Sequence, residues 1–170
     1  MCHHKNMEKF EVLNKIKNIL IKNNLSLSSA ESCTGGLISS YLTDISGASA
    51  FIFQNFVTYS NDAKIKYLDV SPETLKKYGA VSEQTAYEMS KGLLKLTDCS
   101  IATTGILGPT GDTPDKPIGL VYISLGCKND IKVIKYISKM GYTKDRYLIK
   151  TDIVEYALFE LMKYLENTLN

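Results

Sequence analysis

The sequence is poor in the residues that most often serve as catalytic bases and metal ligands. It has no tryptophan and only two histidines, His3 and His4, which stand at the start of the chain, isolated from any carboxylate. Histidine is the usual general base near neutral pH, so a nucleophile in this chain needs another residue to take its proton. Because the histidines are isolated and no two cysteines have zinc-site spacing, we expect no metal site.

Long apolar runs and a strong excess of one charge are also missing. No segment approaches the ~18 consecutive apolar residues of a membrane span, so we expect no membrane association. The 20 basic and 18 acidic residues give a net charge of +2, which is too small to predict nucleic-acid binding. The four cysteines, Cys2, Cys33, Cys99 and Cys127, follow no signal peptide, and we expect them to be reduced thiols of a cytoplasmic protein.

The sequence does contain a regular alternation of helical and strand patterns over its 170 residues. Apolar spacing and capping residues predict helices over 8–23, 36–43, 61–68, from Pro72 onward, 82–96 and 144–167. Short apolar and β-branched runs predict strands over 25–30, 51–59, 100–104, 118–125 and 131–138. This order predicts a single three-layer α/β/α domain over 1–170, with a mixed, mostly parallel sheet of about five strands. We expect residues 1–6 to be an extension outside that fold.

The first candidate site is the turn between the strand at 25–30 and the helix at 36–43, which reads AESCTGG over 30–36. Gly35 and Gly36 allow a ligand to approach the backbone closely. Free N–H groups at a helix start attract anions. We expect the N–H groups near Gly35 and Gly36, or that of Gly105, to be able to stabilise an oxyanion. The alternative is a purely structural role, in which Ser32 or Thr34 caps the helix.

The second candidate is Lys64, which lies in the first turn of the helix at 61–68, shortly after Tyr59 and Asn61. A lysine base must be neutral, which requires its pKa to fall from ~10.4 to about 7–8. Burial or a neighbouring cation would lower the pKa in this way. Alternatively, Lys64 is an ordinary surface charge and Tyr59 an ordinary strand residue.

The third candidate is a glycine-rich loop at 105–117, which follows Thr104 at the end of a strand. Such loops at the carboxyl ends of strands commonly bind ligands in α/β proteins. Lys116 in the loop and Arg146, the only arginine of the chain, are candidates for binding a phosphate or a carboxylate. The alternatives are a flexible connection, a solvated lysine and a surface arginine in a salt bridge.

Five motifs, AESCTGG, VTYSNDAK, GAVSE, TGILGP and DKPIG, occur in the order and spacing of one family. On these motifs the chain resembles the CinA carboxy-terminal domain, a family that includes stand-alone nicotinamide-nucleotide amidohydrolases. The resemblance covers about residues 10–165. It implies hydrolysis of the carboxamide of nicotinamide mononucleotide (NMN) to nicotinate mononucleotide and ammonia, without a cofactor or a metal. It also implies a three-layer fold with a mixed sheet, and a homodimer.

The resemblance assigns roles to individual residues. It implies that Ser32 is the nucleophile and Lys64 the base, with Tyr59 and Thr104 assisting proton transfer. We expect the nucleotide to be bound by Thr34, Gly35, Gly36, Asn61, Gly105, Gly108, Gly111, Lys116 and Arg146.

The chain departs from the family pattern at two places in the 105–117 loop. Leu107 stands where the family usually has alanine, and Asp112 replaces the second glycine of a common pair. The first change adds bulk beside the expected pocket, and the second adds a carboxylate that would repel a phosphate facing it. Two alternative functions also stay open: a nucleotide-binding module without chemistry, and a scaffold whose exposed helices bind a DNA-uptake or repair partner.

Overall fold

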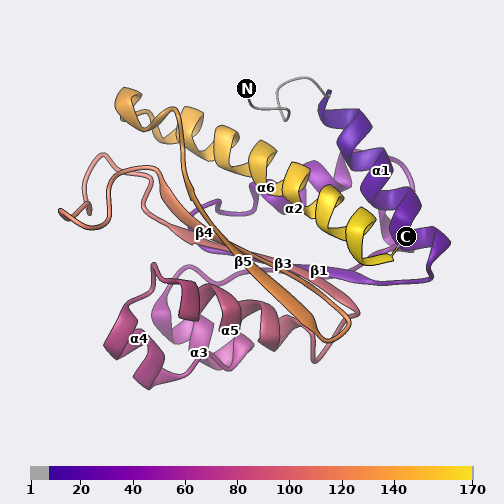
Figure 1. The fold of residues 1–170 in the computed structure, drawn as a ribbon, viewed down its shortest axis with the longest axis horizontal. Coiled ribbons are helices and arrows are strands. Elements are labelled where there is room, and N and C mark those ends of the chain that lie inside the picture. Colours follow the sequence, from indigo (N-terminus) through magenta and orange to yellow (C-terminus); the bar gives the residue numbers. More distant parts are fainter. Residues whose placement is uncertain (1–7, 170) are drawn as a thin grey trace.

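Two groups of helices enclose a five-stranded sheet, which gives three layers (Figure 1). This computed structural model describes residues 8–169; the extension expected over 1–6 lies outside them. Helices α1 (Lys9–Lys22), α2 (Leu37–Thr43) and α6 (Arg146–Leu169) cover one face, and α3 (Asn61–Leu68), α4 (Pro72–Tyr78) and α5 (Glu83–Leu93) cover the other. The predicted three-layer α/β/α fold is confirmed.

The sheet is mixed, as predicted. Its strands lie in the order β2 (Ile52–Val57), β1 (Leu27–Glu31), β3 (Cys99–Gly105), β4 (Leu120–Cys127) and β5 (Asp130–Ile137). Strand β1 pairs in parallel with β2 and β3, whereas the β3–β4 and β4–β5 pairs are antiparallel. Because Glu31 pairs with Thr103, the turn after β1 and the loop after β3 leave the sheet side by side.

Apolar side chains fill the space on both faces of the sheet. The larger cluster lies under α1, α2 and α6 and includes Leu20, Ile101 and Ile153, all fully buried. The smaller cluster lies under α3, α4 and α5 and includes Ala102 and Met89. Among residues 8–169, no helix is long and apolar enough to cross a bilayer.

Several element boundaries differ from the predicted ones. The helix predicted over 82–96 ends at Leu93 and continues as turns. Strand β4 begins two residues later than predicted and extends to Cys127, because its antiparallel register with β3 carries the pairing as far as Cys99. The hairpin turn is thereby shortened to Lys128 and Asn129. Two short 3₁₀ helices, Ala48–Ala50 and Gly141–Thr143, were not predicted.

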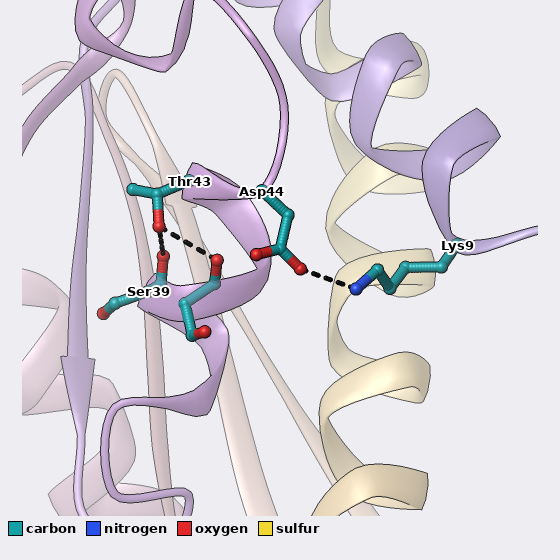
Figure 2. A network of polar contacts seen from close by, with 5 residues as sticks. Lys9, Ser39, Thr43 and Asp44 are labelled. Atoms are coloured by element: carbon teal, nitrogen blue, oxygen red, sulfur yellow. Dashed lines mark hydrogen bonds and ion pairs between the residues drawn. The ribbon is translucent and has the colours of Figure 1, made fainter.

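Helix α2 is short, and polar contacts fix its carboxyl end. Asp44 forms an ion pair with Lys9 of α1 at 2.6 Å (Figure 2). The Thr43 hydroxyl donates to the backbone carbonyls of Ser39 and Ser40, both at 2.9 Å. The ion pair ties α2 to α1, whereas the Thr43 bonds lie within α2. Helix α2 in turn follows directly on the turn that carries Ser32.

The cysteines correct one expectation. Cys99 and Cys127 lie directly opposite each other across β3 and β4, with their Cα atoms 4.1 Å apart, and they form a disulfide. The sequence predicted reduced thiols because each cysteine stands in a different sequence context and no signal peptide was recognised; Cys99 and Cys127 are 28 residues apart. Only the strand register places them together. Cys33 is a free, buried thiol.

Candidate active site

Ser32 and Lys64 meet at the carboxyl end of β1. Ser32 is half-buried and is the first residue after β1, where its N–H donates to the Thr103 carbonyl of β3 at 3.0 Å. Lys64 lies in the first turn of α3, which begins at a Ser60 cap whose hydroxyl accepts from the Ala63 N–H at 3.1 Å. The Lys64 Nζ lies 3.0 Å from the Ser32 Oγ.

The surroundings of Lys64 are unusual for a lysine. The residue is 1% exposed, and its Nζ also donates to the backbone carbonyls of Thr58 at 2.9 Å and Tyr59 at 3.2 Å. No carboxylate in the described part of the chain forms an ion pair with it. Burial therefore lowers the pKa of Lys64 below its ordinary value of 10.5. The sequence alternative of a solvated surface lysine is wrong.

Cys33, the neighbour of Ser32, is not a competing nucleophile. Its side chain is 6% exposed, and burial raises the pKa of its thiol to about 12. The reactive form of cysteine is the thiolate, which this environment disfavours near neutral pH. The hydroxyl of Ser32 is thus the group of this turn that lies against the Lys64 amine.

The Glu31 carboxylate holds the start of α2. It is fully buried and accepts the backbone N–H groups of Gly36 at 3.0 Å, Ile38 at 3.0 Å and Ser39 at 2.8 Å, together with the Ser39 hydroxyl at 2.7 Å. A negative charge at this position is favoured by the free N–H groups and the dipole of the helix. Glu31 therefore does the capping that the sequence analysis offered, as an alternative to a ligand site, to Ser32 or Thr34.

The backbone donors of the Ser32 turn differ from those expected. The Gly35 N–H donates to the Ser32 carbonyl at 3.2 Å, and the Gly36 N–H is taken by Glu31. Within residues 8–169, the N–H groups of Cys33 and Thr34 make no hydrogen bond to another residue. These two donors, rather than those of the glycines, are available to an oxyanion formed beside Ser32.

A pocket of about 260 Å³ opens beside the Ser32–Lys64 pair. Eight of the predicted site residues line it: Ser32, Tyr59, Lys64, Thr104, Gly105, Gly108, Gly111 and Arg146. Leu107 also lines the pocket, whereas Asp112 does not. The Arg146 guanidinium donates to the Gly108 carbonyl, which ties the start of α6 to the loop after β3. The turn after β1, the start of α3 and the loop after β3 thus form one site.

Five predicted binding residues do not line this pocket: Thr34, Gly35, Gly36, Asn61 and Lys116. The buried Thr34 hydroxyl lies 2.8 Å from the Thr103 hydroxyl. Asn61 is exposed at the start of α3, and the Gly36 amide is bonded to Glu31. Lys116 donates to the backbone carbonyls of Tyr78 at 3.1 Å and Val81 at 2.7 Å, so it fastens the loop to the segment before α5.

Sequence reasoning assigned no role to three residues of this region. Ala80 and Val81 line the pocket, and the Ala80 carbonyl accepts from the Thr104 hydroxyl at 2.7 Å. Both belong to the GAVSE motif, which was noted without a role. Glu31 belongs to AESCTGG and lies five residues before the cap residue Gly36, outside the positions at which a carboxylate usually caps a helix start, so no local pattern indicated its role.

Known proteins are similar to this chain in sequence and in fold. The family described as the CinA C-terminal domain matches residues 9–165. A CinA-like protein of Fusobacterium nucleatum is 50% identical over 141 residues, which are 83% of this chain and 34% of that protein. The chain spans about a third of the length of the curated relatives it matches.

Solved structures agree with the sequence match. A CinA superfamily protein from Klebsiella pneumoniae is 30% identical, with a TM-score of 0.86 that covers 95% of this chain and 99% of that one. The competence/damage inducible protein CihA from Agrobacterium tumefaciens is 39% identical, with a TM-score of 0.84 that covers 92% and 94% of the two chains. The chain therefore belongs to the CinA C-terminal domain family.

Proposed function

We propose that the protein is an amidohydrolase that cleaves the carboxamide of NMN, with Ser32 as nucleophile and Lys64 as base. The observation that carries this proposal is the 3.0 Å distance between the Ser32 Oγ and the Nζ of Lys64, a residue that is 1% exposed and has no ion-pair partner among the described residues. A buried lysine whose pKa is lowered is a recognised general base. The substrate itself is inferred from the family.

The hydrogen-bond geometry suits a neutral amine. An ammonium group has three N–H donors and no acceptor, whereas a neutral amine has two donors and one lone pair. The carbonyls of Thr58 and Tyr59 take two donors of Lys64. The lone pair is then left to accept the Ser32 proton, which is the direction of transfer that activates the serine.

The reaction proceeds in two stages. Neutral Lys64 takes the Ser32 proton as the Oγ bonds to the carboxamide carbon, and the carbonyl oxygen becomes an oxyanion beside the Cys33 and Thr34 N–H groups. Protonated Lys64 gives its proton to the nitrogen as the C–N bond breaks, and ammonia leaves. Lys64 then deprotonates a water that attacks the acyl carbon, and its proton returns to Ser32 as nicotinate mononucleotide departs. In this scheme Tyr59 and Thr104 assist proton transfer.

Ammonia release from NMN tests the proposal. We expect Ser32→Ala and Lys64→Met each to lower kcat by about a thousandfold or more, while both variants still fold and bind NMN. The matched controls are Ser40→Ala and Lys66→Met, which remove an exposed hydroxyl and an exposed ammonium group from α2 and α3. We expect both controls to retain the wild-type rate.

The same assay separates an enzyme from a binding module. A module without chemistry predicts no ammonia from the wild-type protein with NMN, nicotinamide or glutamine, and a Ser32→Ala change that alters affinity alone. That result would overturn the proposed function. Retained activity in Lys64→Met would instead overturn the role of Lys64 as the base.

A further inference from the structure

A bound nucleotide phosphate needs a positively charged partner. Two groups expected to bind the phosphate, the start of α2 and Lys116, are already bonded to other parts of the protein. This inference rests on the proposed function. A helix start commonly binds phosphate, but the start of α2 is filled by the buried Glu31 carboxylate. Lys116 is committed to the carbonyls of Tyr78 and Val81. The anion must therefore be held by other residues near the pocket.

Lys150 is a cation beside the site that sequence reasoning did not consider. Its Nζ lies 3.6 Å from the point where a Cβ on Gly35 would stand, so it faces the turn that carries Ser32. Burial is the largest effect on the pKa of the nearby Cys33 thiol and raises it, whereas the positive charge of Lys150 acts to lower it. Lys150 is half-buried, and its side chain makes no hydrogen bond or ion pair with another described residue.

Lys150 and Arg146 reach two segments at the site from one helix: Arg146 lines the pocket, and Lys150 lies beside the adjacent turn. They are four residues apart on α6, so their side chains lie on the same face. Arg146 donates to Gly108 in the loop after β3, whereas Lys150 faces Gly35 in the turn after β1. In Figure 1 the start of α6 lies at the same end of the molecule as that loop.

The charge pattern of α6 opposes its own stability. Cations near a helix N-terminus are disfavoured by the helix dipole, and like charges four residues apart repel each other. No acidic residue lies in the first turn of α6, although Asp145 just before it accepts the Tyr147 N–H at 2.8 Å. Violations of local preference of this kind are expected at functional sites. An anion bound between the two side chains would offset their mutual repulsion.

We propose that Lys150, together with Arg146, binds the phosphate of the nucleotide and makes the enzyme select a phosphorylated substrate over the corresponding nucleoside. Lys150 is then a specificity-determining residue, since it contacts the phosphate and not the carboxamide. Removing one charge-assisted hydrogen bond changes affinity about tenfold.

The test compares NMN with nicotinamide riboside, which has the same ring and ribose but no phosphate. We expect Lys150→Met to lower the ratio of kcat/KM for NMN to that for the riboside about tenfold, through a higher KM for NMN. The matched control is Lys163→Met, which removes an exposed lysine about 20 Å farther along α6. We expect this control to keep the wild-type ratio. An unchanged ratio in Lys150→Met would overturn the inference.

A binding experiment keeps this inference separate from the proposed function. Calorimetry of Ser32→Ala with NMN and with the riboside measures the preference for phosphate without any turnover. We expect Ser32→Ala to prefer NMN, and the Ser32→Ala, Lys150→Met double variant to lose most of that preference. If the wild-type protein releases no ammonia but the double variant loses the preference for NMN, the proposed function fails and the phosphate site stands. If both variants prefer NMN equally, the phosphate site fails.

Discussion

At the residue scale, Lys64 combines a charge-bearing group with a buried position. The cost of burying an ammonium group falls on its protonated form alone, because the neutral amine needs no counterion. Two backbone carbonyls orient the group, and the Ser32 hydroxyl is its remaining partner. The same burial that disfavours the charged form of Lys64 suits it to the role of base that we propose for it.

This burial predicts a pH dependence of stability. In the unfolded chain Lys64 titrates near 10.5, and in the folded protein its pKa is lower. Between these two values the unfolded chain binds more protons, so the free energy of unfolding contributed by Lys64 rises with pH and levels off above 10.5. We expect the wild-type protein to gain stability relative to Lys64→Met as the pH rises toward 10.5.

Urea unfolding at several pH values between 6 and 10 measures this difference. Lys66→Met, on the same helix, corrects for the loss of a lysine as such. A wild-type minus Lys64→Met difference that stays constant over the whole range would show that Lys64 keeps its ordinary pKa in the fold.

At the element scale, the turn between β1 and α2 is held by Glu31 rather than by a cap residue of the helix. The residue at the cap position, Gly36, has a left-handed backbone (φ 97°) and no side chain to accept a hydrogen bond. The Glu31 carboxylate reaches from the end of β1 to three amides of α2. Ser32 lies in the turn between the end of β1 and the start of α2, which this carboxylate connects.

Glu31→Ala is expected to destabilise the protein by about 2–4 kcal/mol, because it leaves buried donors without an acceptor. Thermal or urea unfolding measures this loss. Glu83→Ala is the matched control, since Glu83 is an exposed acidic residue in the first turn of α5; we expect an effect of about 0.5 kcal/mol or less. Equal effects of the two substitutions would contradict the capping role of Glu31.

At the scale of the whole molecule, the Ser32–Lys64 pair joins two layers. Ser32 precedes α2 on one face of the sheet, whereas Lys64 belongs to α3 on the other face (Figure 1). The distance between their side chains therefore depends on how closely α3 packs. That packing rests on Gly92 of α5, where a Cβ would stand 2.7 Å from the Leu68 carbonyl carbon at the end of α3.

Gly92→Ala is expected to push α3 away from α5. Alanine is the better helix former by about 1 kcal/mol, but the clash outweighs this gain, and we expect a net loss of about 1–3 kcal/mol in the free energy of unfolding. The rate of ammonia release should fall as well, because Lys64 moves with α3. The control is Lys91→Ala, an exposed neighbour in α5. A more stable Gly92→Ala variant would contradict this account of the packing.

Local patterns in the sequence determined the order of helices and strands, because apolar spacing and capping residues act within a few neighbours. They also determined the candidate segments, since polar residues and glycines at strand ends mark a ligand site in an α/β fold. The motifs of AESCTGG and VTYSNDAK named Ser32 and Lys64. Nothing local in the sequence showed that the two side chains meet.

Only the tertiary structure decided which of these residues share a site. Burial depends on contacts between distant segments, so the lowered pKa of Lys64 and the raised pKa of Cys33 follow from packing. The same holds for Lys116, whose donors were taken by carbonyls of another segment, and for Lys150, which reaches the Ser32 turn from α6. The sequence determines which chemical groups each side chain carries. The fold determines which other groups they contact and how deeply they are buried.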